Sequence, residues 1–404
     1  MNEFGGTLEL PLYDEHHRAL ARSASAWCAE RSGVWDEARR EPADKGATRV
    51  LRELGAGGWL GFLDPSSSGQ AGDLRSACLM REVLANADDL ADHAFAIQTL
   101  TAAPIQRHGD AAQRDLYLPG LATGELAGAF AVSEEQAGSD LAAVVLRAEP
   151  VPGGYVLDGH KTWIAQGTIA DVYCVLARTG EGPGPLGLTA FLVPAGTPGL
   201  RAEPIDVIAP RSFARLEFTG CRVPADAVLG RRGGGYQVVL DALERARPTV
   251  GAAAVGFARR ALTEALNHAR GRPAYGGRLF DLPAVRSSLA ELEIELSAAA
   301  LMVGRAAWAA DQAADHGSAG SGALSAAAKV FATEAAQRIV DRAVQIFGAA
   351  GLVSGAVPER LYRQIRSLRI YEGASEVLLA SIAETLPNAR TDARTDRTKE
   401  HRSR

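Results

Sequence analysis

The sequence has 404 residues, with 43 lysines and arginines against 48 aspartates and glutamates, and a formal net charge of −5 at pH 7. With 47% hydrophobic and 23% charged residues, the chain is long and apolar enough for roughly two to three domains with sizeable cores. The mild acidity argues against a nucleic-acid-binding protein, because that function needs basic surface to neutralise phosphates.

The N-terminus, Met1 to Gly6, lacks the basic and then apolar pattern of a secretory signal, and no segment has the apolar length to span a bilayer. The four cysteines are far apart, without a C-x-x-C pair or a histidine cluster of metal-ligand spacing. We therefore expect a cytoplasmic protein without membrane partners, in which these thiols are buried and reduced. The cysteines are Cys28, Cys78, Cys174 and Cys221.

Residues up to about 125 are expected to be helical, because apolar residues recur there at three- and four-residue spacing. Glycine-containing clusters such as residues 69–72 separate the helical segments. The expected helices are Tyr13–Glu30, Ala47–Leu54, Leu74–Leu90 and Ala94–His108.

From about residue 126 to 228 the pattern changes to short apolar runs rich in Val, Phe, Tyr and Trp, separated by turn residues. This pattern predicts a small antiparallel β-domain, either a barrel or a sandwich. The expected strands include Tyr155–Leu157, Leu188–Val193 and Leu216–Phe218.

Helical periodicity returns after the glycines at 233–235 and lasts to about Leu386, which predicts an antiparallel bundle. The glycines themselves follow no parallel strand and lack dinucleotide-fingerprint spacing, so we interpret them as a connection between domains. The expected helices are Tyr236–Arg270, Leu282–Asp315, Ala323–Phe347 and Glu359–Thr385.

These zones predict an α+β multi-domain fold. Its expected parts are an N-terminal α-helical domain over residues 1–125, a middle antiparallel β-barrel or sandwich domain over 126–228, and a C-terminal four-helix bundle over 229–387. The remaining residues, 388–404, contain no large apolar side chain and many Thr, Asp and Arg, which is typical of a disordered tail.

One acidic residue stands out in the last helical zone, where the run from Ile370 to Glu376 places Glu372 directly before Gly373. A single carboxylate is most often a solvated surface group, so this position alone does not establish a base. Glycine at 373 is consistent with a tight turn that lets the backbone approach a ligand. Glu372 is therefore a candidate that needs support from the rest of the chain.

That support is a resemblance to the acyl-CoA dehydrogenase family, which extends from about residue 13 to 387. The most specific stretch runs from Ala129 to Leu141, and it resembles the first signature of the family. Further matching stretches follow in family-like order and spacing. They are Gly159–Ile164, Ala190–Pro194, Arg222–Pro224, Arg272–Gly276 and Gln345–Gly348.

The resemblance implies that Glu372 removes a proton from the carbon next to a thioester carbonyl, while the N5 atom of FAD accepts a hydride from the β-carbon. A base for so weakly acidic a proton works best when desolvation raises its proton affinity, so we expect Glu372 to be buried. The implied oxyanion donors are the backbone N–H of Glu372 and a ribityl hydroxyl of the flavin.

By position in these motifs, the resemblance also implies a set of contact residues. FAD contacts within the subunit are expected from Phe130, Val132, Ser133, Gly138, Ser139, Trp163, Ile164 and Ala165, with Glu376 as a further cofactor contact. Contacts across a subunit boundary are expected from Arg272, Tyr275, Gln345, Phe347 and Gly348, which implies a homo-oligomer, either a dimer or a tetramer. Substrate contacts are expected from Ser139, Glu244, Arg247, Tyr371 and Gly373, with residues 95–101 and Tyr371 at the pocket floor.

The chain also departs from the family pattern. A hydroxyl residue that bonds the flavin is replaced by Ala165, and an interface glutamine by Pro283. The position where some relatives carry the base is Ala246, which leaves Glu372 as the only candidate by position. We therefore expect weakened retention of FAD. The remaining departures are Glu244, Ala349, Ala374 and a shortened segment over residues 208–218.

The expected function is dehydrogenation of an acyl-CoA, with electron transfer to an electron-transfer flavoprotein or a similar acceptor. Three alternative functions stay open. One is dehydrogenation of an acyl or aminoacyl group bound to a carrier protein, suggested by Glu244 and the altered 208–218 segment. Another is a flavin-dependent oxidase or monooxygenase on the same fold, against which Glu372 argues. The last is a non-catalytic assembly partner, which an intact base disfavours.

Overall fold

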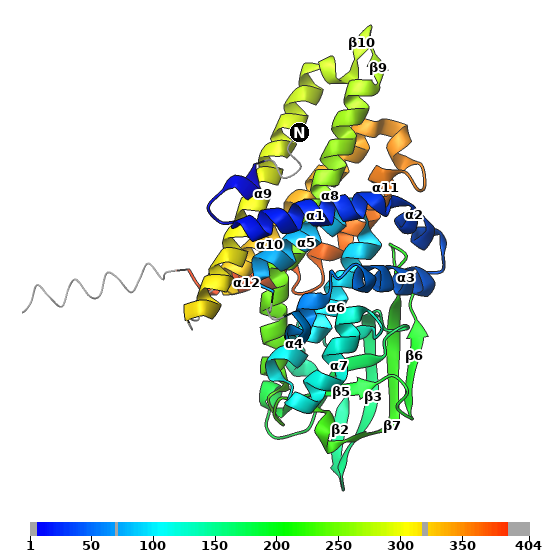
Figure 1. The fold of residues 1–404 in the computed structure, drawn as a ribbon, viewed down its shortest axis with the longest axis vertical. Coiled ribbons are helices and arrows are strands. Elements are labelled where there is room, and N and C mark those ends of the chain that lie inside the picture. Colours follow the sequence, from blue (N-terminus) through cyan, green and yellow to red (C-terminus); the bar gives the residue numbers. More distant parts are fainter. Residues whose placement is uncertain (1–5, 69–71, 317–321, 387–404) are drawn as a thin grey trace, which may run out of the picture.

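The computed structural model of the chain describes residues 6–68, 72–316 and 322–386 (Figure 1). Along the chain, a block of helices is followed by a β-sheet and then by longer helices. The predicted α+β fold class is confirmed. The tail expected over residues 388–404 lies outside the described residues.

Aspartates begin several helices of the first block, because their carboxylates accept hydrogen bonds from otherwise unpaired amides of the first turn. Asp73 accepts from the amide of Ser76 at 2.7 Å, and Asp110 from that of Gln113 at 2.8 Å. The helices are α1 (Glu15–Glu30), α2 (Ser32–Arg40), α3 (Ala43–Ala56), α4 (Pro65–Ser68), α5 (Leu74–Ala87), α6 (Asp89–His108) and α7 (Ala111–Thr123).

The middle block forms a sheet in the order β6-β7-β3-β2-β4-β5-β8, with β1 beside β4. Most neighbours are antiparallel, but β1 and β2 each pair with β4 in parallel, so the sheet is mainly rather than wholly antiparallel. Its strands are β1 (Gly128–Ala131), β2 (Arg147–Val151), β3 (Gly154–Ala165), β4 (Val172–Arg178), β5 (Leu188–Pro194), β6 (Leu200–Pro204), β7 (Phe213–Pro224) and β8 (Val228–Leu229).

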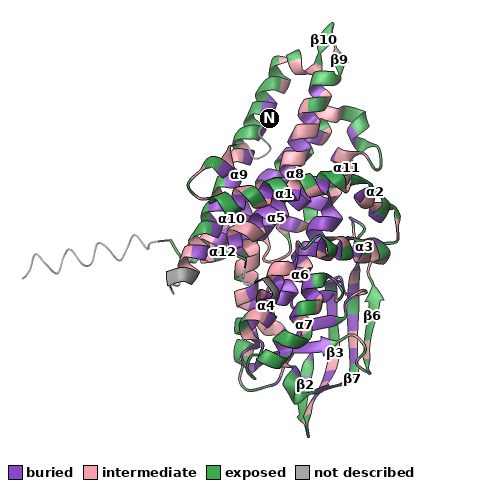
Figure 2. Cartoon of the chain, in the orientation of Figure 1, coloured by how far each residue is buried: buried purple, intermediate pink, exposed green. Residues whose placement is uncertain are grey.

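The last block is organised around the long helix α8, which packs against α5, α9 and α10 and is largely buried along its middle (Figure 2). Small side chains allow the close approach, since a Cβ atom on Gly256 of α8 would lie 2.3 Å from the carbonyl oxygen of Glu82 on α5. The helices are α8 (Gly235–Gly271), α9 (Pro283–His316), α10 (Gly322–Phe347), α11 (Val357–Ile365) and α12 (Ser375–Glu384), with the hairpin β9 (Pro273–Ala274) and β10 (Gly277–Arg278) between α8 and α9.

Helix α6 joins the sheet to the last block, because it contacts both β1 and α8. Its contact with β1 is close: a Cβ atom on Gly128 would lie 2.7 Å from the side chain of Thr101. Side chains of α6 share one apolar core with those of β4 and β5, including Phe95, Cys174 and Leu192. Sheet, α6 and α8 therefore meet in one region of the molecule.

The expected continuous helix Glu359–Thr385 is wrong. The chain forms α11, then a short 3-10 turn over Arg366–Arg369, and begins α12 only at Ser375. The interruption occurs at Glu372 and Gly373, whose φ angles of 55° and 103° lie outside the right-handed helical region. The break places Glu372 on a turn rather than on a helix face.

The expectation of buried thiols is confirmed, since all four cysteines are buried and free of disulfides. Within the described ranges, none of the helices has the length and apolar character needed to cross a membrane.

Candidate active site

Glu372 lies in a strained turn. Its φ of 55° belongs to the left-handed region, which non-glycine residues rarely adopt and which is enriched at functional sites. The next residue must be glycine, because a Cβ atom on Gly373 would lie 2.8 Å from the side chain of Leu378 and its φ of 103° disfavours other residues. The surrounding structure must therefore hold this turn in place.

Hydrogen bonds from α8 and α10 hold this turn in place. The Nζ atom of Lys329 on α10 donates to the carbonyl oxygen of Gly373 at 2.7 Å, and the Nε atom of Arg247 on α8 donates to that of Glu372 at 3.4 Å. Glu334 on α10 accepts hydrogen bonds from Arg369 before the turn at 2.7 Å and from Ser375 after it at 2.8 Å. Both ends of the turn are thus tied to the helical bundle.

The carboxylate of Glu372 is shielded from solvent and lies near several cations. Its Oε2 atom is buried and, among the described residues, has no hydrogen-bond partner. Burial raises the pKa of Glu372 above its ordinary value, while the nearby cations Arg81, Lys329 and Arg247 oppose the rise. The burial expected for a base is present, and the cations keep its charged form accessible.

Two cavities meet at Glu372. The first, here called the sheet-side cavity, has a volume of about 170 Å³ and lies between the sheet, α6 and the turn. The second, the helix-side cavity, has a volume of about 270 Å³ and lies among the segment after α3, α5, α6 and α8. Glu372, Ala96 and Leu100 line both cavities, so Glu372 faces the junction between them.

The sheet-side cavity brings together many residues singled out in the sequence. Its walls are mostly apolar and aromatic, and Trp163, with a φ of 55°, remains 52% exposed. Ala96, Ile97 and Leu100 come from the expected floor segment. The predicted contact residues that line it are Phe130, Val132, Ser133, Gly138, Trp163, Ala165, Tyr371, Glu372 and Gly373.

A buried ion pair fixes the loop after β1 that carries Val132, Ser133 and Gly138. The Nζ atom of Lys161 donates to the carboxylate of Glu134 at 2.8 Å and to the carbonyl oxygen of Val132 at 2.9 Å. Glu134 also accepts from the amides of residues 145 and 146 at 2.8 and 2.9 Å. Satisfying a buried charge with several hydrogen bonds in this way makes the loop rigid.

Other expected contacts lie elsewhere. Ser139, Glu244 and Glu376 are exposed and line neither cavity, and Ile164 is buried in the core of the sheet. Residues expected to act across a subunit boundary lie around the β9–β10 hairpin and the end of α10, away from the sheet (Figure 1). Arg272, Tyr275, Gln345 and Gly348 are exposed there, and Phe347 is half-buried and stacks on His268.

Several lining residues were missed in the sequence. His93 and Phe213 stack on each other beside the sheet-side cavity with ring centroids 5.6 Å apart, and the Nε2 atom of His93 is buried without a partner among the described residues. Burial lowers the pKa of His93 well below its ordinary value, so the ring is neutral at pH 7. No motif marks either position, because α6 and β7 meet only in the folded chain. Further missed residues include Leu141, Leu243, Arg81 and Arg245.

Comparison with known proteins decides the family. Three family models match in order: the N-terminal domain of acyl-CoA dehydrogenases over residues 14–125, the middle domain over 129–221, and the C-terminal domain over 233–386. The chain belongs to the acyl-CoA dehydrogenase family. The predicted class of FAD-dependent oxidoreductase is thereby confirmed.

Individual acyl-CoA dehydrogenases align over nearly the whole chain. "Probable acyl-CoA dehydrogenase FadE25" of Mycobacterium tuberculosis is 31% identical over 369 residues, covering 90% of this chain and 92% of the relative. The human mitochondrial short-chain specific acyl-CoA dehydrogenase is 33% identical over 338 residues, covering 82% and 81%. A glutaryl-CoA dehydrogenase of Mycobacterium smegmatis, solved in complex with FADH2, superposes with a TM-score of 0.82 at 26% identity, covering 92% and 95%.

Acyl-CoA dehydrogenases bind FAD, and the residues of this chain fit that cofactor. The sheet-side cavity offers aromatic and apolar side chains to a ring system, and among the described residues the Nε2 atom of His93 beside it has no hydrogen-bond partner. Ala165 lines this cavity and provides no hydroxyl where the family usually has one, but its small side chain leaves room for the cofactor.

Lys329→Met tests how the turn that carries Glu372 is supported. The charge of Lys329 lowers the pKa of Glu372, so its removal should raise that pKa further and move the acid limb of the kcat/KM profile to higher pH. Burial already lowers the pKa of Lys329 itself to about 8. The exposed Lys45 provides the control variant Lys45→Met. An unchanged pH profile in Lys329→Met would contradict this role.

Proposed function

We propose that the protein dehydrogenates a saturated acyl thioester, preferably an acyl-CoA, to the 2-enoyl thioester, with Glu372 removing the α-proton. The observation that carries this proposal is the position of the Glu372 carboxylate, which among the described residues is buried and partnerless at the junction of two cavities. A thioester at this junction would present its α-carbon to Oε2 and extend its acyl chain into the helix-side cavity.

The same turn offers a group for the carbonyl oxygen. Among the described residues, the backbone N–H of Glu372 donates no hydrogen bond, and the αL conformation is held from both sides. A fixed N–H donor stabilises the charge that develops on the thioester oxygen as the proton leaves. Arg247 and Lys329 position the turn through its carbonyl oxygens. When bound in the sheet-side cavity, FAD supplies the acceptor for the β-hydride.

A second copy of the chain would complete the cofactor site. Tyr275 is 94% exposed with a φ of 48°, and the neighbouring residue Arg272 is exposed. A large aromatic side chain held in a strained turn in the open suggests a partner surface. We propose that Arg272, Tyr275 and residues 345–348 contact FAD of another subunit in a dimer or tetramer.

We further propose that the electrons pass to an electron-transfer flavoprotein or a similar acceptor. One of the solved structures that this chain resembles is described as "Electron transferring flavoprotein of Acidaminococcus fermentans", with a TM-score of 0.81 at 28% identity, covering 92% of this chain and 97% of that one. All four cysteines are buried and none forms a disulfide, which supports a reducing compartment, and we place the protein in the cytoplasm.

An anaerobic titration tests the proposed function. The protein is reconstituted with FAD, desalted, and mixed with a panel of acyl-CoAs and acyl-pantetheines while the visible flavin absorbance is recorded. Bleaching by a CoA ester with formation of the enoyl product supports acyl-CoA dehydrogenation. Bleaching by pantetheine esters alone would indicate that the substrate is a carrier-bound acyl group. If the flavin is retained and no thioester bleaches it, the proposal is contradicted.

Ala165→Thr tests the departure at the cofactor wall. Restoring one hydrogen bond of about 0.5–1.5 kcal/mol should tighten FAD binding roughly 2- to 10-fold relative to Ala165→Val, which has the same shape without the hydroxyl. Equilibrium dialysis of FAD against both variants measures the difference. Equal affinities would show that the lost hydroxyl does not limit flavin retention.

A further inference from the structure

The lining of the helix-side cavity is partly apolar and partly charged. Its apolar residues include Ala96 and Leu100, which also line the sheet-side cavity, and Ala246. The charged residues that line it, apart from Glu372, are Asp73, Arg81, Arg107 and Arg245.

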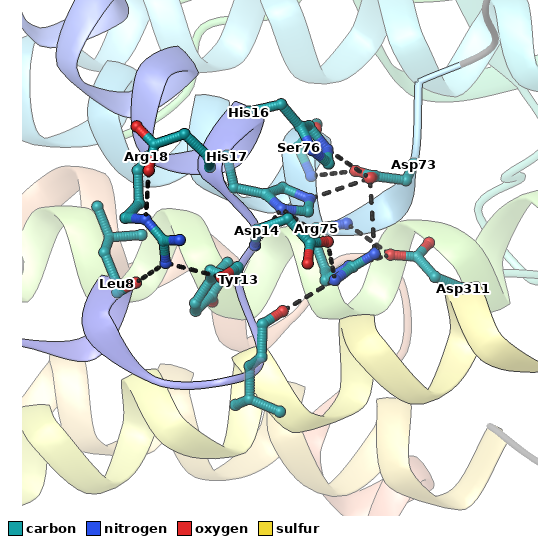
Figure 3. Close-up of polar contacts among 12 residues, drawn as sticks. Leu8, Tyr13, Asp14, His16, His17, Arg18, Asp73, Arg75, Ser76 and Asp311 are labelled. Atoms are coloured by element: carbon teal, nitrogen blue, oxygen red, sulfur yellow. Dashed lines mark hydrogen bonds and ion pairs between the residues drawn. The ribbon is translucent and has the colours of Figure 1, made fainter.

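Most of these charges are neutralised by partners. Arg81 forms two hydrogen bonds with Asp92, at 2.8 and 2.9 Å, and Arg107 donates to Asp241 at 3.1 Å. Asp73 is engaged by the Nε2 atom of His17 at 3.0 Å and by the first turn of α5 (Figure 3). Pairs of this kind present little net charge to a ligand.

Arg245 differs from them. Within the described parts of the chain, its guanidinium has neither a hydrogen bond nor an ion pair, and the side chain is half-buried. Burial lowers the pKa of Arg245, and the neighbouring Arg107 lowers it further, against weaker opposing effects of Asp241 and Asp311. A partly desolvated cation beside another cation is unfavourable unless an anion joins it.

Arg245 lines the same cavity as Glu372. It shares the cavity-facing side of α8 with Ala242, Ala246 and Thr249, at helical spacings of three and four residues. Thr249 accepts a hydrogen bond from Arg81 at 3.2 Å, and Arg245 lies four residues, about one turn, before Thr249 on α8. Arg245 is therefore displaced by about one turn of α8 from the part of the cavity where Arg81 lies.

The cavity wall at Asp73 and Leu74 is rigid. Asp311 on α9 accepts hydrogen bonds from the amide of Leu74 at 2.7 Å and from the Nε atom of Arg75 at 2.8 Å. His17 on α1 holds Asp73, so the beginnings of α1 and α5 and the end of α9 are joined in one network (Figure 3). Asp311 and Asp73 are engaged in these contacts, and among the described residues neither forms an ion pair with Arg245.

We propose that Arg245 binds a carboxylate at the far end of the acyl chain, so that the substrates are ω-carboxyacyl thioesters. This inference rests on the proposed function, because it assumes a thioester at Glu372. The acyl chain would cross the apolar part of the helix-side cavity and place its terminal carboxylate against the guanidinium, which can bind it through two parallel hydrogen bonds.

The test compares thioesters that differ only in the terminal group. Glutaryl-, adipyl-, pimelyl- and suberyl-CoA are paired with the alkanoyl-CoAs of equal carbon number, and calorimetry measures binding to wild-type protein, Arg245→Met, Arg245→Lys and the control Arg260→Met. Arg260 is a half-buried arginine of α8 that pairs with Glu264 and lines neither cavity.

Wild-type protein should bind at least one ω-carboxyacyl-CoA about 10- to 100-fold more tightly than its alkanoyl partner, as expected for a charge-assisted contact. Arg245→Met should lose this preference, Arg245→Lys should keep part of it, and Arg260→Met should keep all of it. The free Arg245→Met variant should also melt at a higher temperature, because an uncompensated cation is removed. A purely structural arginine would lower that temperature instead.

The inference is overturned if Arg245→Met and wild-type protein show the same ratio of affinities for every pair. Since calorimetry needs no turnover, that outcome is independent of the proposed reaction. Flavin bleaching by alkanoyl-CoAs together with an unchanged ratio would retain the dehydrogenase and reject the role of Arg245. A carboxylate preference lost in Arg245→Met without bleaching by any thioester would retain the role of Arg245 and reject the dehydrogenase.

Discussion

Glu372→Gln should lower the rate of flavin reduction by acyl-CoA by about two to four orders of magnitude, because the variant cannot accept the α-proton. The amide is close in shape to the carboxylate, so the turn, the flavin wall and substrate affinity should be retained. Stopped-flow measurement of flavin bleaching at saturating acyl-CoA gives the rate directly. Glu384→Gln, an exposed change near the end of α12, is the matched control.

The same substitution should raise stability at neutral pH. Burial raises the pKa of Glu372 in the folded state, so the folded state favours the protonated form. The stability contribution of the group is therefore fully present below its unfolded pKa and is lost as the pH rises through the folded pKa. Glu372→Gln should therefore melt at a higher temperature than wild-type protein at pH 7, and at the same temperature at low pH.

The two measurements on Glu372→Gln are independent of each other. A rate of flavin reduction equal to that of wild-type protein would exclude Glu372 as the base, whatever the melting temperature.

Arg81→Met should destabilise the fold by about 3–5 kcal/mol, because it leaves Asp92 as an unpaired buried charge. Arg81 is 1% exposed and Asp92 is 2% exposed, and a further hydrogen bond joins Arg81 to Thr249 at 3.2 Å. Denaturant unfolding of the holoenzyme measures the loss. The double variant Arg81→Met/Asp92→Leu removes both charges and should recover most of it.

Arg81→Met should also change the pH dependence of catalysis. Arg81 lowers the pKa of Glu372 and Asp92 raises it, so losing the cation alone should move the acid limb of kcat/KM to higher pH. In the double variant the two effects partly cancel, so the acid limb of the kcat/KM profile should return toward its pH in wild-type protein. If both variants keep the wild-type pH profile, Arg81 and Glu372 are not electrostatically coupled.

The sequence predicted the parts of this site that lie within motifs. Val132, Ser133 and Trp163 were predicted as FAD contacts because their stretches resemble family signatures, and all three line the sheet-side cavity. Glycine after Glu372 also indicated the turn. The helix expected over 359–385 failed because periodicity of apolar residues continues through the turn and does not report a positive φ at Glu372.

Residues that act through long-range contacts could not be predicted in this way. His93 on α6 meets Phe213 on β7, far along the sequence, and Arg81 influences Glu372 from a helix of the first block. Arg245 has no distinguishing neighbour in the sequence, and its lack of a partner among the described residues becomes apparent only when the cavity is formed. Such features depend on how α5, α6 and α8 pack.

The most direct test of the central claim is the rate of anaerobic flavin reduction by an acyl-CoA deuterated at the α-carbon, compared with the unlabelled ester. If Glu372 removes the α-proton as proposed, the wild-type protein should bleach with both esters and more slowly with the deuterated one. Equal rates would show that α-proton removal does not limit flavin reduction, and absence of bleaching with either ester of a substrate shown to bind would contradict the dehydrogenase account.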